Sequence, residues 1–184
     1  PLGMLGAVVA FAGSKVLAAQ RLQYFWRASG VQISDRDNLK LYALGMVYNL
    51  FLPGGIGGDG YKVYRLRKDF GVGVKALGSA VLLDRGNGLA LLIVLALAMS
   101  PLVALPYGLS NYLWALIPVV LAGYGLVVRV LFRRCWATIL PTSLWSLGVQ
   151  LGQVATAAGV LWALGVDGQI LDYIFILLLS AIVL

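Results

Sequence analysis

The sequence predicts an all-α integral membrane protein, a polytopic helical bundle with a re-entrant helical hairpin at a glycine-rich motif. Hydrophobic residues make up 61% of the chain and charged residues 11%, far from the composition of a soluble domain. Several apolar stretches approach the roughly 20 residues that a helix needs to cross hydrocarbon, and the period-two alternation of strands is absent. The net charge of +7 comes from short basic clusters between these stretches. Such clusters indicate cytoplasmic loops, and we expect no nucleic-acid partner.

We expect one membrane domain across residues 1–184. Because the chain starts at Pro1 and stops within an apolar run at Leu184, we interpret it as part of a longer protein. Cys135 is the single cysteine, which leaves neither a disulfide nor a cysteine metal site within the chain.

The first predicted span covers residues 2–19. Arg21 and Arg27 follow it among aromatic residues, so this stretch is interpreted as a cytoplasmic collar. Residues 29–38 are mostly polar and offer N-cap residues for a helix that begins near Leu39. That helix, residues 39–52, would be about 21 Å long, whereas the hydrocarbon core is about 30 Å thick. It is too short to cross.

A glycine cluster at residues 53–60 follows this short helix, and it contains Asp59. Next comes a second basic cluster, Lys62 to Lys68, which the positive-inside rule places on the same side as the first. The segment at about 39–61 is therefore predicted to enter the membrane and return. Glycines suit such a turn because they reach positive φ without strain and allow close approach of a neighbouring helix.

The remaining sequence predicts further spans. Residues 70–99 are divided at Asp84 and Arg85 into a short inserted or interfacial helix and a crossing helix. Residues 100–111 carry no charge and are assigned to an outer loop. We expect Pro118 to kink the span that follows this loop. The later predicted spans cover residues 112–128, 144–164 and 173–184.

Four motifs lie in the middle of the chain: Asn49-Leu50-Phe51-Leu52-Pro53, Gly57-Gly58-Asp59, the basic residue Lys62, and Leu82-Leu83-Asp84-Arg85. Together they resemble the lysylphosphatidylglycerol synthase transmembrane family, also called the flippase-like domain family. The resemblance implies a membrane domain that moves or presents lipids, namely aminoacylated phosphatidylglycerol in the best-known members, with hopanoid and polyprenyl-linked roles suspected for others. Lys62 and Asp84 replace the arginine and glutamate usual in the family, so the charge is kept while the geometry and reach differ.

Other interpretations of these residues stay open. The glycine cluster formally satisfies a dinucleotide fingerprint, but no strand precedes it and no βαβ unit surrounds it. Asp59 is either a helix cap or a polar group with a transport role. Arg85 could reach Asp59 or a lipid phosphate, or it could form a salt bridge that serves folding. The basic cluster that contains Lys62 and Arg65 is either an orientation signal or a binder of anionic headgroups.

The function we expect is translocation or presentation of a lipid with an anionic or aminoacylated headgroup, in a bacterial or archaeal cell (inner) membrane. The alternatives are a membrane enzyme acting on polyprenyl phosphates, with Asp59, Asp69 and Asp84 holding a metal, and a structural partner of a lipid synthase. The absence of His and Glu from the chain argues against the enzyme. We expect no cofactor and no metal; membrane lipids are the expected partners, and a homo-oligomer is possible. The candidate substrate-binding residues are Asn49, Pro53, Gly57, Gly58, Asp59, Lys62, Arg65, Asp84 and Arg85.

Overall fold

The computed structural model describes residues 2–51, 56–103, 106–166 and 168–183, and within these ranges it contains helices and no strand. The α-helices are α1 (Leu2–Ala28), α2 (Asp35–Phe51), α3 (Gly57–Phe70), α4 (Val74–Met99), α5 (Ile117–Leu131), α6 (Ile139–Ala163) and α7 (Ile170–Val183). Short 3-10 helices are η2 (Ser100–Leu102), η3 (Pro106–Asn111), η4 (Leu113–Leu116) and η5 (Arg133–Thr138).

Four helical segments of the described chain are long and apolar enough to cross a membrane, namely Leu2–Ala28, Val74–Leu102, Leu113–Leu131 and Arg133–Ala163. Most of their side chains face outward, and the protein surface carries many exposed leucine and valine side chains. Such an apolar exterior suits contact with lipid chains. The prediction of an all-α integral membrane protein is confirmed.

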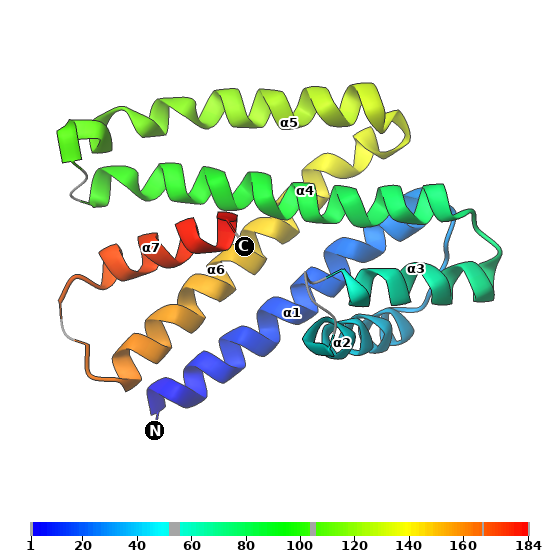
Figure 1. Cartoon of the computed structure of the whole chain (residues 1–184), viewed down its shortest axis with the longest axis horizontal. Coiled ribbons are helices and arrows are strands. Elements are labelled where there is room, and N and C mark those ends of the chain that lie inside the picture. The colour runs from blue at the N-terminus through cyan, green and yellow to red at the C-terminus, as the bar shows by residue number, and fades with distance from the viewer. Residues whose placement is uncertain (1, 52–55, 104–105, 167, 184) are drawn as a thin grey trace.

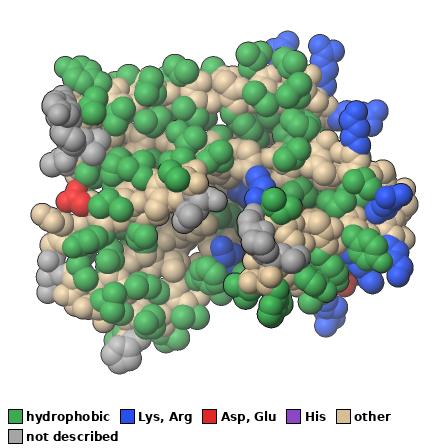
Figure 2. Space-filling view, viewed as in Figure 1, with side chains coloured by type: hydrophobic (Ala, Val, Ile, Leu, Met, Phe, Trp, Pro, Cys, Tyr) green, Lys and Arg blue, Asp and Glu red, His purple; other side chains and the backbone are tan. Residues whose placement is uncertain are grey.

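Basic side chains gather at one end of the molecule (Figure 2). Helices α1, α3 and α5 each end with a basic residue in the last turn, at Arg27, Lys68 and Arg129 respectively. The positive-inside rule identifies this end as the cytoplasmic one.

Helices α1 and α6 run side by side across the molecule (Figure 1). Small residues permit their close approach. A Cβ atom added to Gly152 would come within 2.9 Å of the Cβ of Ser14, and one added to Gly159 would lie 3.1 Å from the Cβ of Ala7. Van der Waals packing of small residues therefore holds this helix pair together, as is common between membrane helices.

The α1–α6 packing yields a first prediction. We expect Gly152→Val to lower the free energy of unfolding by about 1 to 3 kcal/mol, because the added side chain must push α1 away. The control is Gly123→Val on α5, where an added Cβ would meet no atom within 4 Å. Thermal unfolding of both variants in detergent measures the difference. Equal melting temperatures would show that α1 and α6 do not pack in this way.

The sequence expectation about α4 was wrong. Helix α4 continues without a break from Val74 to Met99, through Asp84 and Arg85, whereas a boundary was expected at this pair. A charged pair does not end a helix when each charge has a partner on a neighbouring helix, as both have here. Pro118 lies in the first turn of α5, directly after η4, where its missing N–H leaves no hydrogen bond of the helix unmade. A kink of the span at Pro118 stays a prediction.

The buried apolar residues form two clusters that are separated along α4. The first packs Leu77 and Leu83 of α4 against residues such as Trp26 of α1. The second packs the other half of α4, including Leu92, against Phe175 of α7. The stretch of α4 between the clusters carries Asp84, Arg85 and Asn87. The two apolar clusters thus enclose a polar middle layer.

Candidate functional site

A buried ion pair joins α1 to α4 in this middle layer. The Nε and a terminal nitrogen of Arg21 donate to the two carboxylate oxygens of Asp84 at 2.7 and 3.0 Å. Arg21 is only 6% exposed. The interpretation of Arg21 as part of a cytoplasmic collar was therefore wrong. Helix α1 runs on to Ala28 instead of ending at residue 19, so Arg21 faces α4 inside the bundle.

A network of hydrogen bonds extends from Arg21 to α6 and α5. Its second terminal nitrogen donates to the hydroxyl of Ser146 at 2.8 Å, and that hydroxyl donates to the side-chain oxygen of Asn87. The Asn87 amide in turn donates to the hydroxyls of Tyr124 and Ser143, at 3.1 and 3.2 Å. Each of these polar side chains has a partner, as buried polar groups require.

Helices α2 and α3 form a hairpin. At its closed end the Gly58 backbone N–H donates to the side-chain oxygen of Asn49 at 2.7 Å. The rings of Tyr48 and Tyr61 stack at 4.4 Å between centroids. An added Cβ on Gly58 would overlap the Gly45 carbonyl oxygen, so the two backbones touch here.

The open ends of α2 and α3 also lie together. Asp37 and Lys40, near the start of α2, line the same 480 Å³ cavity as Arg65 and Asp69, near the end of α3. The end of α3 therefore lies beside the start of α2. Whether this hairpin is inserted in the membrane stays a prediction.

Helix α2 begins earlier than the sequence suggested, at Asp35, because Ser34 caps it. The Ser34 hydroxyl accepts from the Asp37 N–H at 3.1 Å and donates to the Asp37 carboxylate at 2.7 Å. This hydrogen bond, helped by Lys40, lowers the pKa of Asp37. The cap leaves Asn38 in the first turns, where its amide donates to the Ala19 carbonyl at 2.6 Å and ties α2 to α1.

Asp59, in the first turn of α3, accepts hydrogen bonds from two cations. Lys62 Nζ donates to one carboxylate oxygen at 3.0 Å, and Arg85 Nε of α4 donates to the other at 2.6 Å. Lys62 is 6% exposed, and its ammonium group lies 4.6 Å from the ring centre of Tyr42. Charge pairing, more than capping, therefore accounts for Asp59. Adjacent residues Asp84 and Arg85 have separate partners, as their divergence on a helix predicts.

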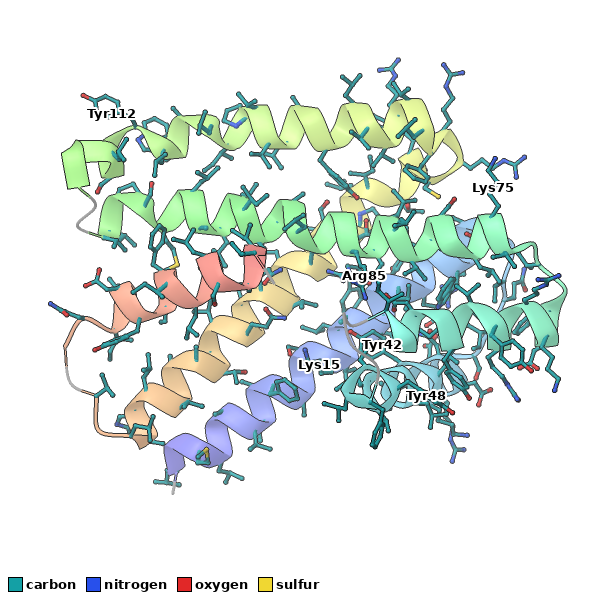
Figure 3. All side chains as sticks on the ribbon, viewed as in Figure 1. Lys15, Tyr42, Tyr48, Lys75, Arg85 and Tyr112 are labelled. Carbon is teal, nitrogen blue, oxygen red and sulfur yellow. The ribbon has the colours of Figure 1, made fainter. Side chains whose placement is uncertain are left out.

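A cavity of about 630 Å³ lies where these elements meet. Figure 3 shows Lys15, Tyr42 and Arg85 near one another in the middle of the molecule, away from Lys75 and Tyr112 at its two ends. In Figure 2, Lys and Arg side chains lie in a hollow of this face between hydrophobic ones. We call this space the central cavity; its charged and polar lining residues are Lys15, Arg21, Tyr42, Arg85, Gln150 and Gln153.

The lining of the central cavity combines polar and apolar side chains. Its remaining lining comes mostly from leucine, valine and isoleucine, and Leu82 and Leu89 also reach the protein surface. None of the residues that the structure assigns to its lining is an aspartate. The cavity thus offers cations next to exposed leucines, a combination that suits a ligand with an anionic group and an apolar part.

The predicted site residues fall into three groups. Asp59, Lys62, Asp84 and Arg85 lie in or directly beside the central cavity through their ion pairs. Asn49 and Gly58 close the hairpin, and Gly57 is the first residue of α3. Arg65 pairs with Asp69 at 2.8 Å on the exposed side of α3 and does not join the cavity. Pro53 lies outside the described residues.

Sequence reasoning missed Lys15, Arg21, Asn87, Ser146 and Gln150 as parts of the site. A signal was available on α6, where four polar residues recur at helical spacing and share a face: Ser143, Ser146, Gln150 and Gln153. From the sequence alone, helix packing explains the two glutamines adequately. Their side chains instead line the central cavity.

The three aspartates proposed for a metal enzyme do not converge. Asp59 pairs with Lys62 and Arg85, Asp84 pairs with Arg21, and Asp69 pairs with Arg65. No group of three or more metal-ligating side chains lies together within the described ranges. The geometry does not favour that alternative.

The chain was compared with models of protein families. The model of the family described as "Lysylphosphatidylglycerol synthase TM region" matches residues 1–136, which include α1 to α5 and most of the central cavity. No curated protein and no solved structure matches the chain.

Proposed function

Because the chain belongs to the lysylphosphatidylglycerol synthase transmembrane family, we propose that its central cavity binds the phosphate-bearing headgroup of a membrane lipid and moves or presents it across the bilayer. The acyl chains stay in the surrounding lipid, along the exposed leucines at the cavity edge. The protein is an integral membrane protein, so its ligand reaches the site from the bilayer itself.

The observation that carries the proposal is the depth of the cations. Lys15 lies midway along α1, Arg85 lies in the central third of the span Val74–Leu102, and Gln150 is near the middle of α6. In this proposal the three spans cross the bilayer about their midpoints and bring these polar groups to a similar depth, near the middle of the hydrocarbon core. Ionisable groups at this depth are costly, and they mark the pathways of polar substrates.

The α2–α3 hairpin is assigned a supporting role in this proposal. Entering and leaving by the cytoplasmic face, it would carry Asp59 and Lys62 to the cavity, where Asp59 orients Arg85. The shared cavity at its open ends and the Asn49–Gly58 hydrogen bond at its closed end support this path. Its glycines allow the tight closure that a turn at membrane depth needs.

Lys15 is the residue to test first. We expect Lys15→Gln to slow movement of a fluorescent phosphatidylglycerol by about tenfold, since loss of one charge-assisted contact costs about 1.5 kcal/mol. The measurement is dithionite quenching of the labelled lipid in vesicles that contain purified protein.

The matched control is Lys75→Gln. Lys75 is an exposed lysine in the first turn of α4, far from Lys15 in Figure 3. This variant should move lipid at the wild-type rate. Equal rates for all three proteins would reject the central cavity as the headgroup site, and equal slowing of both variants would point to a general effect of surface charge.

A further inference from the structure

We infer that the central cavity selects headgroups with a net negative charge, such as phosphate diesters and monoesters without an ammonium group, and disfavours aminoacylated headgroups. This inference rests on the proposed function and specifies its substrate class. The observation that supports it is the excess of positive over negative side chains in the polar middle layer.

Among the residues that the structure describes, six charged side chains meet in and around the central cavity. The cations are Lys15, Arg21, Lys62 and Arg85, and the anions are Asp59 and Asp84. Their net charge is +2. Two buried or half-buried positive charges in excess are unfavourable in a medium of low dielectric, and an anionic ligand relieves this cost.

The carboxylates are already engaged. Both oxygens of Asp84 accept from Arg21, and the two oxygens of Asp59 accept from Lys62 and Arg85. An ammonium group entering the cavity would have to compete with these cations for a carboxylate. The neighbouring aromatic face, that of Tyr42, is held by the ammonium group of Lys62. The cavity therefore provides anion-binding groups and no prepared place for a second ammonium.

Lys15 provides the excess charge that is easiest to remove. Its ammonium group lies 4.7 Å from the ring centre of Phe11, on its own helix, and it lines the cavity beside Arg21 and Arg85. Arg21 is fixed by a bidentate pair, so changing it would disturb the fold. Lys15 can be altered while the three ion pairs at the cavity stay in place.

Total charge separates the candidate headgroups. Phosphatidylglycerol carries one negative charge and would bring the site to +1, and a phosphate monoester with two negative charges would bring it to zero. Lysylphosphatidylglycerol carries one phosphate and two ammonium groups, and it would raise the total to +3. At the distances within one cavity, such differences decide binding.

The test measures equilibrium binding to purified full-length protein in detergent micelles. The probes are short-chain phosphatidylglycerol, short-chain phosphatidic acid, short-chain lysylphosphatidylglycerol and soluble glycerol 3-phosphate. For wild type we expect both anionic lipids to bind at least tenfold more tightly than the lysyl lipid. Lys15→Gln should lower this ratio of affinities between the anionic lipids and the lysyl lipid. Lys15→Glu brings the site charge to zero and should lower the ratio below about twofold.

Lys75→Glu makes the same charge change at the cytoplasmic end and should keep the wild-type ratio. Equal or tighter binding of the lysyl lipid by wild type would overturn the inference, as would a Lys75→Glu effect equal to that of Lys15→Glu. Glycerol 3-phosphate should bind at least tenfold more weakly than the lipids because it lacks acyl chains; equal affinity would assign the site to a soluble phosphate and overturn the lipid assignment.

The transport and binding experiments separate the inference on selectivity from the proposed function. If lipid transport depends on Lys15 while the lysyl lipid is preferred, the inference on selectivity is wrong and the proposed function stands. If transport does not respond to Lys15→Gln, the proposed function itself is wrong.

Discussion

Replacing Asp84 by alanine is expected to lower the free energy of unfolding by about 3 to 5 kcal/mol, because it leaves the buried guanidinium of Arg21 without its counter-charge. Arg21 is 6% exposed and donates to both oxygens of Asp84, so water cannot replace the lost partner. Arg21 would also lose the orientation in which it donates to Ser146. Thermal or denaturant unfolding in detergent measures the effect.

Asp69→Ala is the matched control. Its pair with Arg65 has a similar distance, 2.8 Å, but the two side chains are 51% and 38% exposed, so the loss should stay below about 1 kcal/mol. The double variant Arg21→Met with Asp84→Leu removes both charges and should recover part of the stability. If Asp84→Ala and Asp69→Ala destabilise equally, the Arg21–Asp84 pair is not buried as described.

Gly58→Leu is expected to open the α2–α3 hairpin. Its side chain would overlap the backbone of Gly45, which cannot move without separating the helices, and would also displace the side-chain oxygen of Asn49. Overpacking of this kind costs about 1 to 3 kcal/mol. Separation of the helices would also withdraw Asp59 from Arg85, so we expect lipid transport to fall with stability. Both are measurable on the same reconstituted protein.

Gly60→Leu, two residues further along α3, provides the control. Gly60 also lies in α3, but an added Cβ would meet no atom within 4 Å, and leucine has the higher helix propensity. This variant should be neutral or stabilise by up to about 1 kcal/mol. Equal loss of stability and transport in both glycine variants would contradict close contact between α2 and α3 at Gly58.

Hydropathy and charge predicted the fold class because both depend on long stretches of sequence. A span such as Leu2–Ala28 needs only its apolar length to be recognised. The break predicted at Asp84 was wrong because the sequence does not reveal that Arg21 lies beside it. From the sequence alone Asp84 indicates a helix end, because its partner Arg21 is 63 positions away and cannot be recognised.

The site was predictable where its residues are close in sequence. Asp59 and Lys62 share one motif, and the separate partners of Asp84 and Arg85 follow from helix geometry. Arg21 resembled an ordinary residue of a cytoplasmic collar. It became part of the site only when the packing of α1 against α4 and α6 was known, because its partners Asp84 and Ser146 lie on two other helices.

The proposal can be tested most directly by asking whether a lipid headgroup reaches the central cavity at mid-membrane depth. In a Cys135→Ser background, a single cysteine is placed at Gln153, which lines the cavity, or at Leu151, which is 52% exposed on the same helix and does not line it. Each protein is reconstituted with a phospholipid that carries a thiol-reactive group on its headgroup.

Because hydrocarbon excludes charged headgroups, only a polar cavity can bring the reactive group to this depth. We predict that the cysteine at position 153 forms a covalent adduct with the lipid, detected by mass spectrometry, and that the cysteine at position 151 does not. An adduct at neither position, or equal adducts at both, would contradict a headgroup site in the central cavity.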